Sequence, residues 1–322
     1  MYVNLEQLRS FVTVAELGNF TRAAEHLHLA QPSLSRQIAT LEHDLAAELF
    51  HRARAGSTPT LAGESLLPLA RRMLADADSI RRELAELAGL QRGRVRLGAT
   101  PTLCISLVAE VLSAFHSAHP GIELHLSEQG SKLLLEQLAG GELDLALITT
   151  SAEASTEQFT ITPLLVEELV VISSSKAPPV TEDDSIGLEA VARLPQIVFS
   201  STYDLRSATD AAFRTAGVSP HPVIEGAEMD AVLRFVERGL GIAIVPAMVL
   251  IDRPGLRAAR LSDPTLTRTI SIARTAGITP AAAVNVMQHT ITRTARDLAA
   301  RSGAAMRLAS SSASEAVARS QA

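Results

Sequence analysis

The chain has 322 residues, of which 47% are hydrophobic and 20% are charged, a composition that leaves room for two or three domains and excludes a chain disordered throughout. Its formal net charge is -6, so nucleic-acid binding would have to rest on a local surface rather than on the field of the whole molecule. Cys104 is the only cysteine, which excludes an intramolecular disulfide and a cysteine-rich zinc site.

The N-terminal sequence lacks the basic start, apolar core and small-residue cleavage site of a signal peptide. No run of about 18 uncharged apolar residues is present, so we expect no transmembrane span. We therefore expect a soluble cytoplasmic protein that carries no metal and no cofactor.

Residues 1–60 show the pattern of three short helices. Apolar residues from Leu5 to Ala15 repeat at steps of three and four, which predicts a first helix that ends near Gly18. Thr21 is expected to cap a second helix over residues 22–27. A third helix follows a short break and has Pro32 in its first turn, where a missing N–H costs little.

The third helix separates into an apolar and a polar face. Leu34, Ile38, Leu41 and Leu45 share the apolar face, and the opposite face carries Pro32, Ser33, Arg36, Ala39, Thr40 and His43. A helix before it and a tight joint between the two are typical of a helix-turn-helix that presents one helix to the major groove.

Specific side chains on this helix suit DNA contacts. Arg36 can donate two hydrogen bonds to guanine or clamp a phosphate, while Gln31, Ser33 and Ser35 can reach base edges or backbone oxygens. Residues 1–60 hold five arginines and six acids, so a phosphate-binding surface requires segregated charge. We expect one basic face made of Arg22, Arg36, Arg52 and Arg54.

Residues 61–90 carry a different repeat. The apolar positions alternate steps of four and three, the spacing of a coiled-coil seam: Leu66, Ala70, Met73, Ala77, Ile80, Leu84 and Leu87. This predicts a helix that pairs with a second copy and that begins or kinks at Pro68. The alternative is a helix packed on its own domain.

Strands and helices alternate after Gly93. Two βαβαβ units are predicted, over residues 94–149 and 196–245, and helix-joined strands of this kind imply parallel pairing. The apolar stretches 161–174 and 269–273 are expected to cross between two lobes, and a last helix over 280–300 to return to the first lobe. Residues 301–322 contain 6 Ser and 7 Ala, which predicts a disordered tail.

The carboxyl ends of the predicted strands are rich in small and hydroxyl side chains. Ligands of parallel α/β lobes gather at such ends, beside helix N-termini. The candidate effector-binding residues are Thr100, Pro101, Thr102, Gly130, Ser131, Thr149, Ser201, Thr202 and Gly226, with Tyr203 and Arg206 in the helix that follows. Each of these residues could instead merely cap a helix.

Arg206 and Cys104 each have two interpretations. Arg206 could bind a ligand carboxylate or pair with Asp204 or Asp210. Cys104 lies just after the first strand end, where it could act as a redox sensor or as a small buried apolar residue. The strand ends as a whole favour a small polar or anionic molecule.

The run LEQLRSFVTVAELGNFTRAAEHLHLAQPSLSRQIATLEHDLAAELFHR, followed by TLAGESLLP, resembles the winged helix-turn-helix of LysR-type transcriptional regulators. The resemblance places the helix-turn-helix over residues 20–39. It puts Gln31, Pro32, Ser35 and Arg36 at the groove, with Thr21 and Arg22 also expected at the DNA. Ala55 stands where family wings often carry an arginine, and Arg54 could replace it.

The same resemblance implies a domain plan. Residues 3–60 would form a winged helix-turn-helix DNA-binding domain and 61–92 a long linker (dimerisation) helix. Residues 93–300 would form an α/β effector-binding domain of two Rossmann-like lobes, similar to type 2 periplasmic binding proteins. Lobe I would span 93–165 and 268–300, lobe II 166–267, and 301–322 would be a disordered tail.

The resemblance implies a homodimer, and a homotetramer, on double-stranded DNA with an inverted-repeat operator, controlled by a small-molecule effector. Two other classes compete with this interpretation. One is a cytoplasmic solute-binding module without DNA recognition. The other is an enzyme, and against it the sequence has no G-x-G-x-x-G after a strand, no P-loop, no G-x-S-x-G and no H-E-x-x-H.

Overall fold

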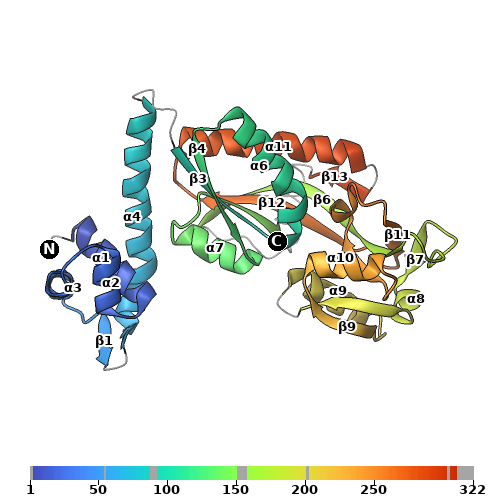
Figure 1. Ribbon diagram of the computed structural model, residues 1–322, viewed down its shortest axis with the longest axis horizontal. Helices are drawn as coiled ribbons and strands as arrows, with labels where there is room; N and C mark the ends of the chain where they lie inside the picture. The colour runs from blue at the N-terminus through green and yellow to red at the C-terminus, as the bar shows by residue number, and fades with distance from the viewer. Residues whose placement is uncertain are drawn as a thin grey trace, which may run out of the picture. The chain divides into compact units, whose positions relative to one another are not determined.

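The computed structural model describes residues 3–53, 56–87, 93–150, 158–200, 203–302 and 305–309. These residues fall into two compact units. One holds the N-terminal 93 residues together with Glu136–Asp144, and the other holds Arg94–Leu135 and the chain from Leu145 onward. The N-terminal helices and the α/β lobes (Figure 1) are therefore described separately.

Three helices form the N-terminal bundle: α1 (Leu5–Leu17), α2 (Phe20–His26) and α3 (Gln31–Leu45). Phe11, Leu34, Ile38 and Leu41 are fully buried at its centre, so the apolar face predicted for the third helix is the face that packs inward. Burial of such side chains contributes about 1.5–3 kcal/mol each and fixes which side of α3 remains outside.

The cap of α2 differs from the sequence expectation. Asn19, not Thr21, is the N-cap, and its side chain accepts hydrogen bonds from the backbone N–H groups of Thr21 and Arg22. The Asn19 cap starts the helix at Phe20, whose ring packs edge-on against Phe50 with centroids 5.7 Å apart. Thr21 is therefore free to face outward.

A two-stranded wing follows α3. Strands β1 (Phe50–Ala53) and β2 (Gly56–Pro59) pair antiparallel, with Arg52 opposite Ser57. The amide of Ser57 donates to the carbonyl of Gly18 at 2.8 Å, which holds the wing against the end of α1.

Helix α4 (Leu61–Leu87) begins directly after the wing. The hydroxyl of Thr60 accepts from the amide of Gly63 at 3.1 Å. A Cβ at Gly63 would lie 2.3 Å from the carbonyl oxygen of Leu49, so only glycine fits. Of the two expectations for Pro68, a helix start or a kink, the start is wrong, because α4 begins at Leu61 and Pro68 lies inside it.

The first lobe is built on the strand order β4-β3-β5-β12-β6. Its elements are β3 (Gly93–Ala99), α5 (Pro101–Leu103), the π-helical turn η1 (Cys104–Val108), α6 (Ala109–Ala118), β4 (Ile122–Glu128), α7 (Ser131–Ala139), β5 (Leu145–Thr150), β12 (Thr267–Thr275) and α11 (Ala282–Ser302). Strands β3 and β5 are parallel, as predicted. Helices α6 and α11 lie over the same face of these strands (Figure 1), and Phe115 and Met287 are buried together with Leu97.

Strand β6 (Phe159–Ser174) runs through both lobes. Its first part, up to Glu168, pairs antiparallel with β12, while Leu169–Ile172 pair with β10 (Ala243–Pro246) and Val170–Ser174 with β11 (Leu256–Ser262). Both segments expected to cross are strands of one sheet, but only β6 pairs with strands of both lobes, while β12 pairs with β5 and the first part of β6. The change of partner at Glu168 marks where the lobes meet.

The second lobe contains β8 (Pro195–Phe199), α9 (Asp204–Thr215), β9 (His221–Ala227), α10 (Met229–Glu237) and the 3-10 turn η2 (Ala247–Leu250). Strands β8 and β9 are parallel, as predicted, whereas the predicted final strand, β10, ladders antiparallel with β6. The sequence interpretation missed β7 (Ser185–Gly187), α8 (Leu188–Ala192) and β11, which are too short or too irregular in pattern to stand out.

The C-terminal end departs from the expectation of disorder from residue 301. Strand β13 (Met306–Leu308) pairs antiparallel with Leu165–Glu167 of β6, and Met306 is buried among the residues of the first lobe. Met306 supplies the apolar anchor that the Ser- and Ala-rich composition conceals. Residues 310–322 of the predicted tail lie outside the described part of the chain.

One described helical run, Pro101–Ala118, is long and apolar enough to cross a membrane by length and composition alone. Its Leu103, Leu107, Val111 and Phe115 are buried in the core of the first lobe. A helix whose apolar stripe packs on its own sheet has the character of a core helix.

Candidate functional site

The outer face of α3 carries the polar side chains expected from the sequence. Six of its residues are exposed: Pro32, Ser33, Arg36, Ala39, Thr40 and His43. No other described residue hydrogen-bonds to or pairs with the Arg36 guanidinium, so its five N–H donors face solvent. Asn4, Gln7 and Ser33 border the same shallow hollow as Arg36.

Neighbouring predicted contacts lie at the surface of the same bundle. Thr21 and Arg22 are exposed in the first turn of α2, and Gln31 is exposed at the start of α3. The amide of Gln31 donates to the hydroxyl of Ser35 at 3.1 Å, so these two side chains are held one helical turn apart on one face. Arg52 lies in β1 of the wing, and Arg54 falls outside the described residues.

A cavity of about 300 Å³ lies at the carboxyl ends of strands from both lobes. It is lined by six of the predicted effector-binding residues: Thr100, Pro101, Thr102, Gly130, Thr149 and Tyr203. Ser131 supports this lining from behind, because its hydroxyl lies 3.1 Å from that of Thr149 and donates to Asp204 at 2.9 Å. Ser201 and Thr202 fall outside the described residues.

Besides Ser131, two predicted effector-binding residues do not line this cavity. Arg206 is bound within its own lobe: Nε donates to both carboxylate oxygens of Asp210 at 2.8 Å, and Nη1 donates to the carbonyl of Phe199 and to Glu225, each at 2.9 Å. Gly226, with φ at 90°, lies in β9 and is likewise absent from the lining. The interpretation of Arg206 as pairing within the protein, in this case with Asp210, is therefore the one that fits.

Four charged residues of the cavity were not predicted as ligand contacts: Glu128, Asp204, Glu228 and Arg268. Asp204 and Glu228 lie at the starts of α9 and α10, where helix dipoles favour negative charge. Their position at predicted helix starts is the sequence feature that could have indicated them as cavity residues. Tyr203 donates its phenol proton to Glu228. Burial raises the pKa of this phenol, and the hydrogen bond raises it further, so Tyr203 stays protonated.

Arg268 connects the cavity to the strand that joins the lobes. Its Nε donates to Glu167 at 2.8 Å, its Nη2 lies 2.7 Å from the same carboxylate oxygen, and its Nη1 donates to the hydroxyl of Thr102 at 2.8 Å. Glu167 is fully buried in β6 and also accepts from the amide of Met248. The Arg268–Glu167 pair therefore links β12 to β6, and its further hydrogen bonds reach Met248 in η2 and Thr102 in the cavity wall.

Cys104 has the chemistry of an inert thiol. It is half-buried beside Glu128, and burial, followed by the Glu128 carboxylate, raises the pKa of the thiol to about 12. Because the thiolate is the reactive form, a thiol with this pKa is a poor nucleophile near neutral pH. The structure thus favours the interpretation of Cys104 as a small packing residue.

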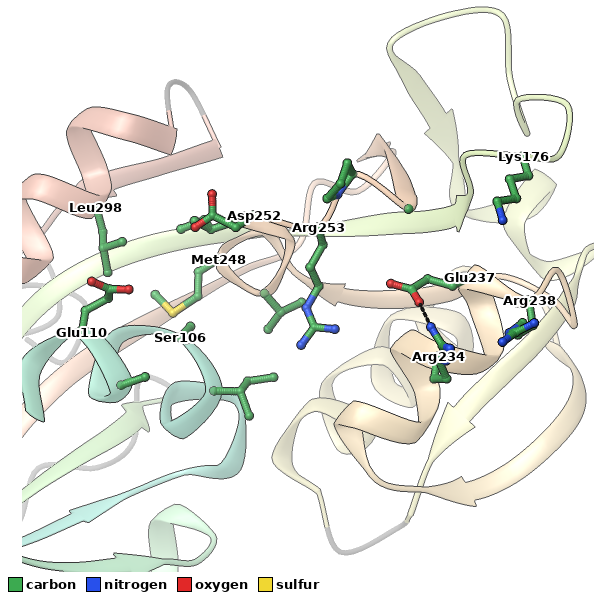
Figure 2. Close-up of a pocket in the computed structure, with 16 residues that line it drawn as sticks. Ser106, Glu110, Lys176, Arg234, Glu237, Arg238, Met248, Asp252, Arg253 and Leu298 are labelled. Carbon is green, nitrogen blue, oxygen red and sulfur yellow. Dashed lines mark hydrogen bonds and ion pairs between the residues drawn. The ribbon is translucent and has the colours of Figure 1, made fainter. Parts of the chain in front are cut away.

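A larger cavity of about 680 Å³ lies elsewhere in the α/β lobes, bordered by η1, α6, α10 and η2 (Figure 2). Charges of both signs surround it, among them Glu110, Lys176, Asp252 and Arg253. Figure 2 shows the ion pair between Arg234 and Glu237, which measures 3.0 Å. None of the predicted effector-binding residues borders this cavity.

Helix α4 presents apolar side chains on two sides. Leu66 and Ala70 pack on the core of the N-terminal bundle, as the alternative interpretation of the seam requires. Met73 is 48% exposed and Ile80 is 60% exposed, and Leu69 lies on the same outer face at 59%. The predicted seam thus packs on the helix's own domain at Leu66 and Ala70 and is exposed at Met73 and Ile80. The side chains of Leu84 and Leu87 lie outside the described residues.

Among the described residues, no group of three or more His, Cys, Asp or Glu side chains could hold a metal ion.

Comparisons with known proteins agree with the geometry of both units. The family "Bacterial regulatory helix-turn-helix protein, lysR family" matches residues 5–64, and "LysR substrate binding domain" matches residues 88–296. The HTH-type transcriptional regulator YybE of Bacillus subtilis (strain 168) is 33% identical over 83% of this chain and 91% of its own.

A probable nitrogen assimilation transcriptional activator of Synechococcus elongatus is 30% identical over 84% of this chain and 88% of its own. Among solved structures, a full-length OxyR variant from Pseudomonas aeruginosa superposes with a TM-score of 0.71 at 25% identity, covering 92% of this chain and 95% of that one. The alternative of a solute-binding module without DNA recognition is wrong, because the helix-turn-helix match covers the whole N-terminal bundle. The chain belongs to the LysR family and is a DNA-binding transcriptional regulator, not an enzyme, with a winged helix-turn-helix and a two-lobed effector-binding domain.

Proposed function

We propose that α3 enters the major groove of duplex DNA and that Arg36, Gln31, Ser33 and Ser35 make its contacts, with Pro32 at the groove. The observation that carries this proposal is the state of Arg36. It is exposed on a helix whose opposite face buries Leu34, Ile38 and Leu41 completely, and it has no partner among the described residues. A rigid helix with an unpaired guanidinium can donate to guanine or phosphate without first breaking an internal ion pair.

Thr21, Arg22, Arg52 and Arg54 position the protein on the phosphate backbone in this proposal. Phosphate contacts fix the register of a protein on DNA and make its affinity fall with salt, while base contacts carry sequence information. Thr21 and Arg22 are exposed beside α3, which supports their place at the same surface. The two wing arginines would contact the flanking backbone.

Two copies pair through α4 in this proposal. The exposed stripe of Leu69, Met73 and Ile80 is the surface that supports it, because a second helix would remove these side chains from water. A two-fold pair of recognition helices reads an inverted repeat, and two such dimers would form a homotetramer.

A small molecule in the 300 Å³ cavity controls the DNA-binding activity in this proposal. The cavity is lined by both lobes, and β6 is the continuous strand between them, so closure on a ligand would change the angle at which the lobes meet. A ligand can shift this equilibrium only if it binds one arrangement more tightly than the other. We place the protein in the cytoplasm, where a DNA-binding regulator meets its DNA.

The test is selection of bound duplexes from a random pool by the purified full-length protein, followed by sequencing. We expect an enriched inverted repeat whose half-sites lie about one helical turn apart, or a multiple of it. Affinity for the selected duplex should fall steeply as salt increases. Enrichment of a sequence without two-fold symmetry would contradict pairing, and no enrichment at low salt would contradict sequence-specific recognition.

A further inference from the structure

We propose that the effector of the 300 Å³ cavity is a small organic cation, a molecule that carries a protonated amine or guanidine group. This inference rests on the proposed role of that cavity as the effector site. It differs from the sequence expectation of a polar or anionic ligand. Three carboxylates from different elements line the cavity. The one cation beside them, Arg268, is already paired with Glu167.

The carboxylates are Glu128 at the end of β4, Asp204 at the start of α9 and Glu228 just before α10. None of the three forms an ion pair with a lysine or arginine in the described part of the chain. Asp204 accepts hydrogen bonds from the hydroxyls of Ser131 and Thr149, at 2.9 and 3.3 Å. Hydroxyl donors satisfy hydrogen bonds but leave the negative charges uncompensated.

Arg268 is the one cation among the described residues that line the cavity. Its side chain is 13% exposed and is held by the fully buried Glu167, with an N–O distance of 2.7 Å. Removing Arg268 from this pair to bind a ligand anion would leave Glu167 buried and unpaired, which is costly. The charge of Arg268 is therefore compensated by Glu167, and only its Nη2 lacks a hydrogen-bond partner among the described residues. Three carboxylates outnumber this one paired cation around the cavity.

Thr100 provides an independent observation. It lines the cavity, is 5% exposed, and its hydroxyl oxygen has no hydrogen-bond partner among the described residues. Buried hydroxyls are normally satisfied, so this one marks a place where a hydrogen-bonding group of a ligand is missing. Its oxygen can accept from an ammonium or guanidinium N–H, while the charge of the ligand is argued from the three carboxylates.

A metal ion fits this cavity less well than an organic cation. In the described part of the chain, no three acidic, histidine or cysteine side chains converge closely enough to hold a metal. The three carboxylates therefore lie too far apart to coordinate one ion together. The volume of about 300 Å³ is at the lower end of the range of small-molecule sites, roughly 300–1,000 Å³. A compact amine fills such a space and reaches more than one carboxylate.

The experiment uses the full-length protein and four probes with the same four-carbon skeleton: butylamine, putrescine, butanediol and succinate. Calorimetric titration and the shift in melting temperature report binding. We expect both amines to bind, putrescine with a Kd below ~1 mM, and butanediol and succinate to give no signal. Raising the ionic strength should weaken putrescine binding, because the attraction is between charges.

Conservative variants assign binding to the cavity. Glu228→Gln and Asp204→Asn should each weaken putrescine binding roughly tenfold, which corresponds to ~1.4 kcal/mol. Glu110→Gln is the matched control, because Glu110 borders the larger cavity in the same unit, and it should leave the Kd unchanged. Equal loss in all three variants, or none, would overturn the proposal.

The probes distinguish two outcomes: the cavity binds an effector of another charge, or it is not an effector site. If succinate binds, the amines do not, and Thr100→Val weakens succinate binding, the cavity is an effector site but its charge class is anionic. If no probe binds, the assignment to a small organic cation is overturned. Duplex selection by the same preparation tests DNA recognition independently of either result.

Discussion

Two arginines that the sequence presents in the same way, each near the start of a helix, occupy opposite states in the structure. Arg36 on α3 is exposed and has no described partner, whereas Arg206 on α9 binds Asp210, Glu225 and the carbonyl of Phe199. The difference lies in their neighbours: no acid faces Arg36 at hydrogen-bond distance, while two acids surround Arg206. An arginine remains available to a ligand only where the fold leaves its donors unused.

Arg268 is, like Arg206, an arginine whose donors are used within the protein. Its substitution is expected to have the largest effect on the free energy of unfolding. Arg268→Ala leaves Glu167 as an uncompensated buried charge, so we expect the free energy of unfolding of the α/β lobes to fall by about 3–5 kcal/mol in chemical denaturation. Arg293→Ala, an exposed arginine on α11, is the control and should change it by less than ~0.5 kcal/mol. Replacing Arg268 and Glu167 together by Met should recover much of the loss; an equally unstable double variant would contradict the pairing.

The same contrast between a used and an available side chain is found among the apolar residues of α4. Leu66 is packed on its own bundle, whereas Ile80 is 60% exposed and available to a second copy. Ile80→Lys should raise the dimer dissociation constant by at least ~100-fold, since each copy loses about 1.5–3 kcal/mol of burial. Analytical ultracentrifugation measures this. Glu64→Lys introduces the same residue on another face of α4 and should leave assembly intact; a dimer unaffected by Ile80→Lys would reject the stripe.

Arg206 gives a smaller effect of a different kind. Arg206→Ala removes hydrogen bonds to Asp210 and Glu225, so we expect a loss of about 1–3 kcal/mol in the free energy of unfolding. Putrescine binding should stay within about twofold of the unmodified protein, because Arg206 does not line the cavity. If the Arg206→Ala variant lost putrescine binding and kept its stability, Arg206 would instead be a ligand-binding residue.

The sequence predicts what depends on local periodicity. The buried face of α3, the parallel strands β3 and β5 and the six lining residues at strand ends all follow from patterns within a few residues. The polar face of α3 is predictable because burying Leu34, Ile38 and Leu41 fixes the rotation of the helix.

What depends on long-range contacts could not be predicted. Glu167 and Arg268 are 101 residues apart, so no local pattern indicates that they pair. Likewise, Arg206 is satisfied by Glu225 on another element, and β13 forms because Met306 reaches the core of the first lobe. The charge of the cavity emerges only when β4, α9 and the start of α10 come together.

The role of α3 in DNA recognition is tested most directly by the affinity of the Arg36→Ala variant for the selected duplex, measured by fluorescence anisotropy at two salt concentrations. We predict a loss of about 1–3 kcal/mol in binding free energy with an unchanged melting temperature, because Arg36 has no described partner in the protein. Arg72→Ala, an exposed arginine on α4, is the matched control and should bind DNA normally. Equal affinity of the Arg36→Ala variant and the unmodified protein would contradict the claim that α3 reads DNA through its polar face.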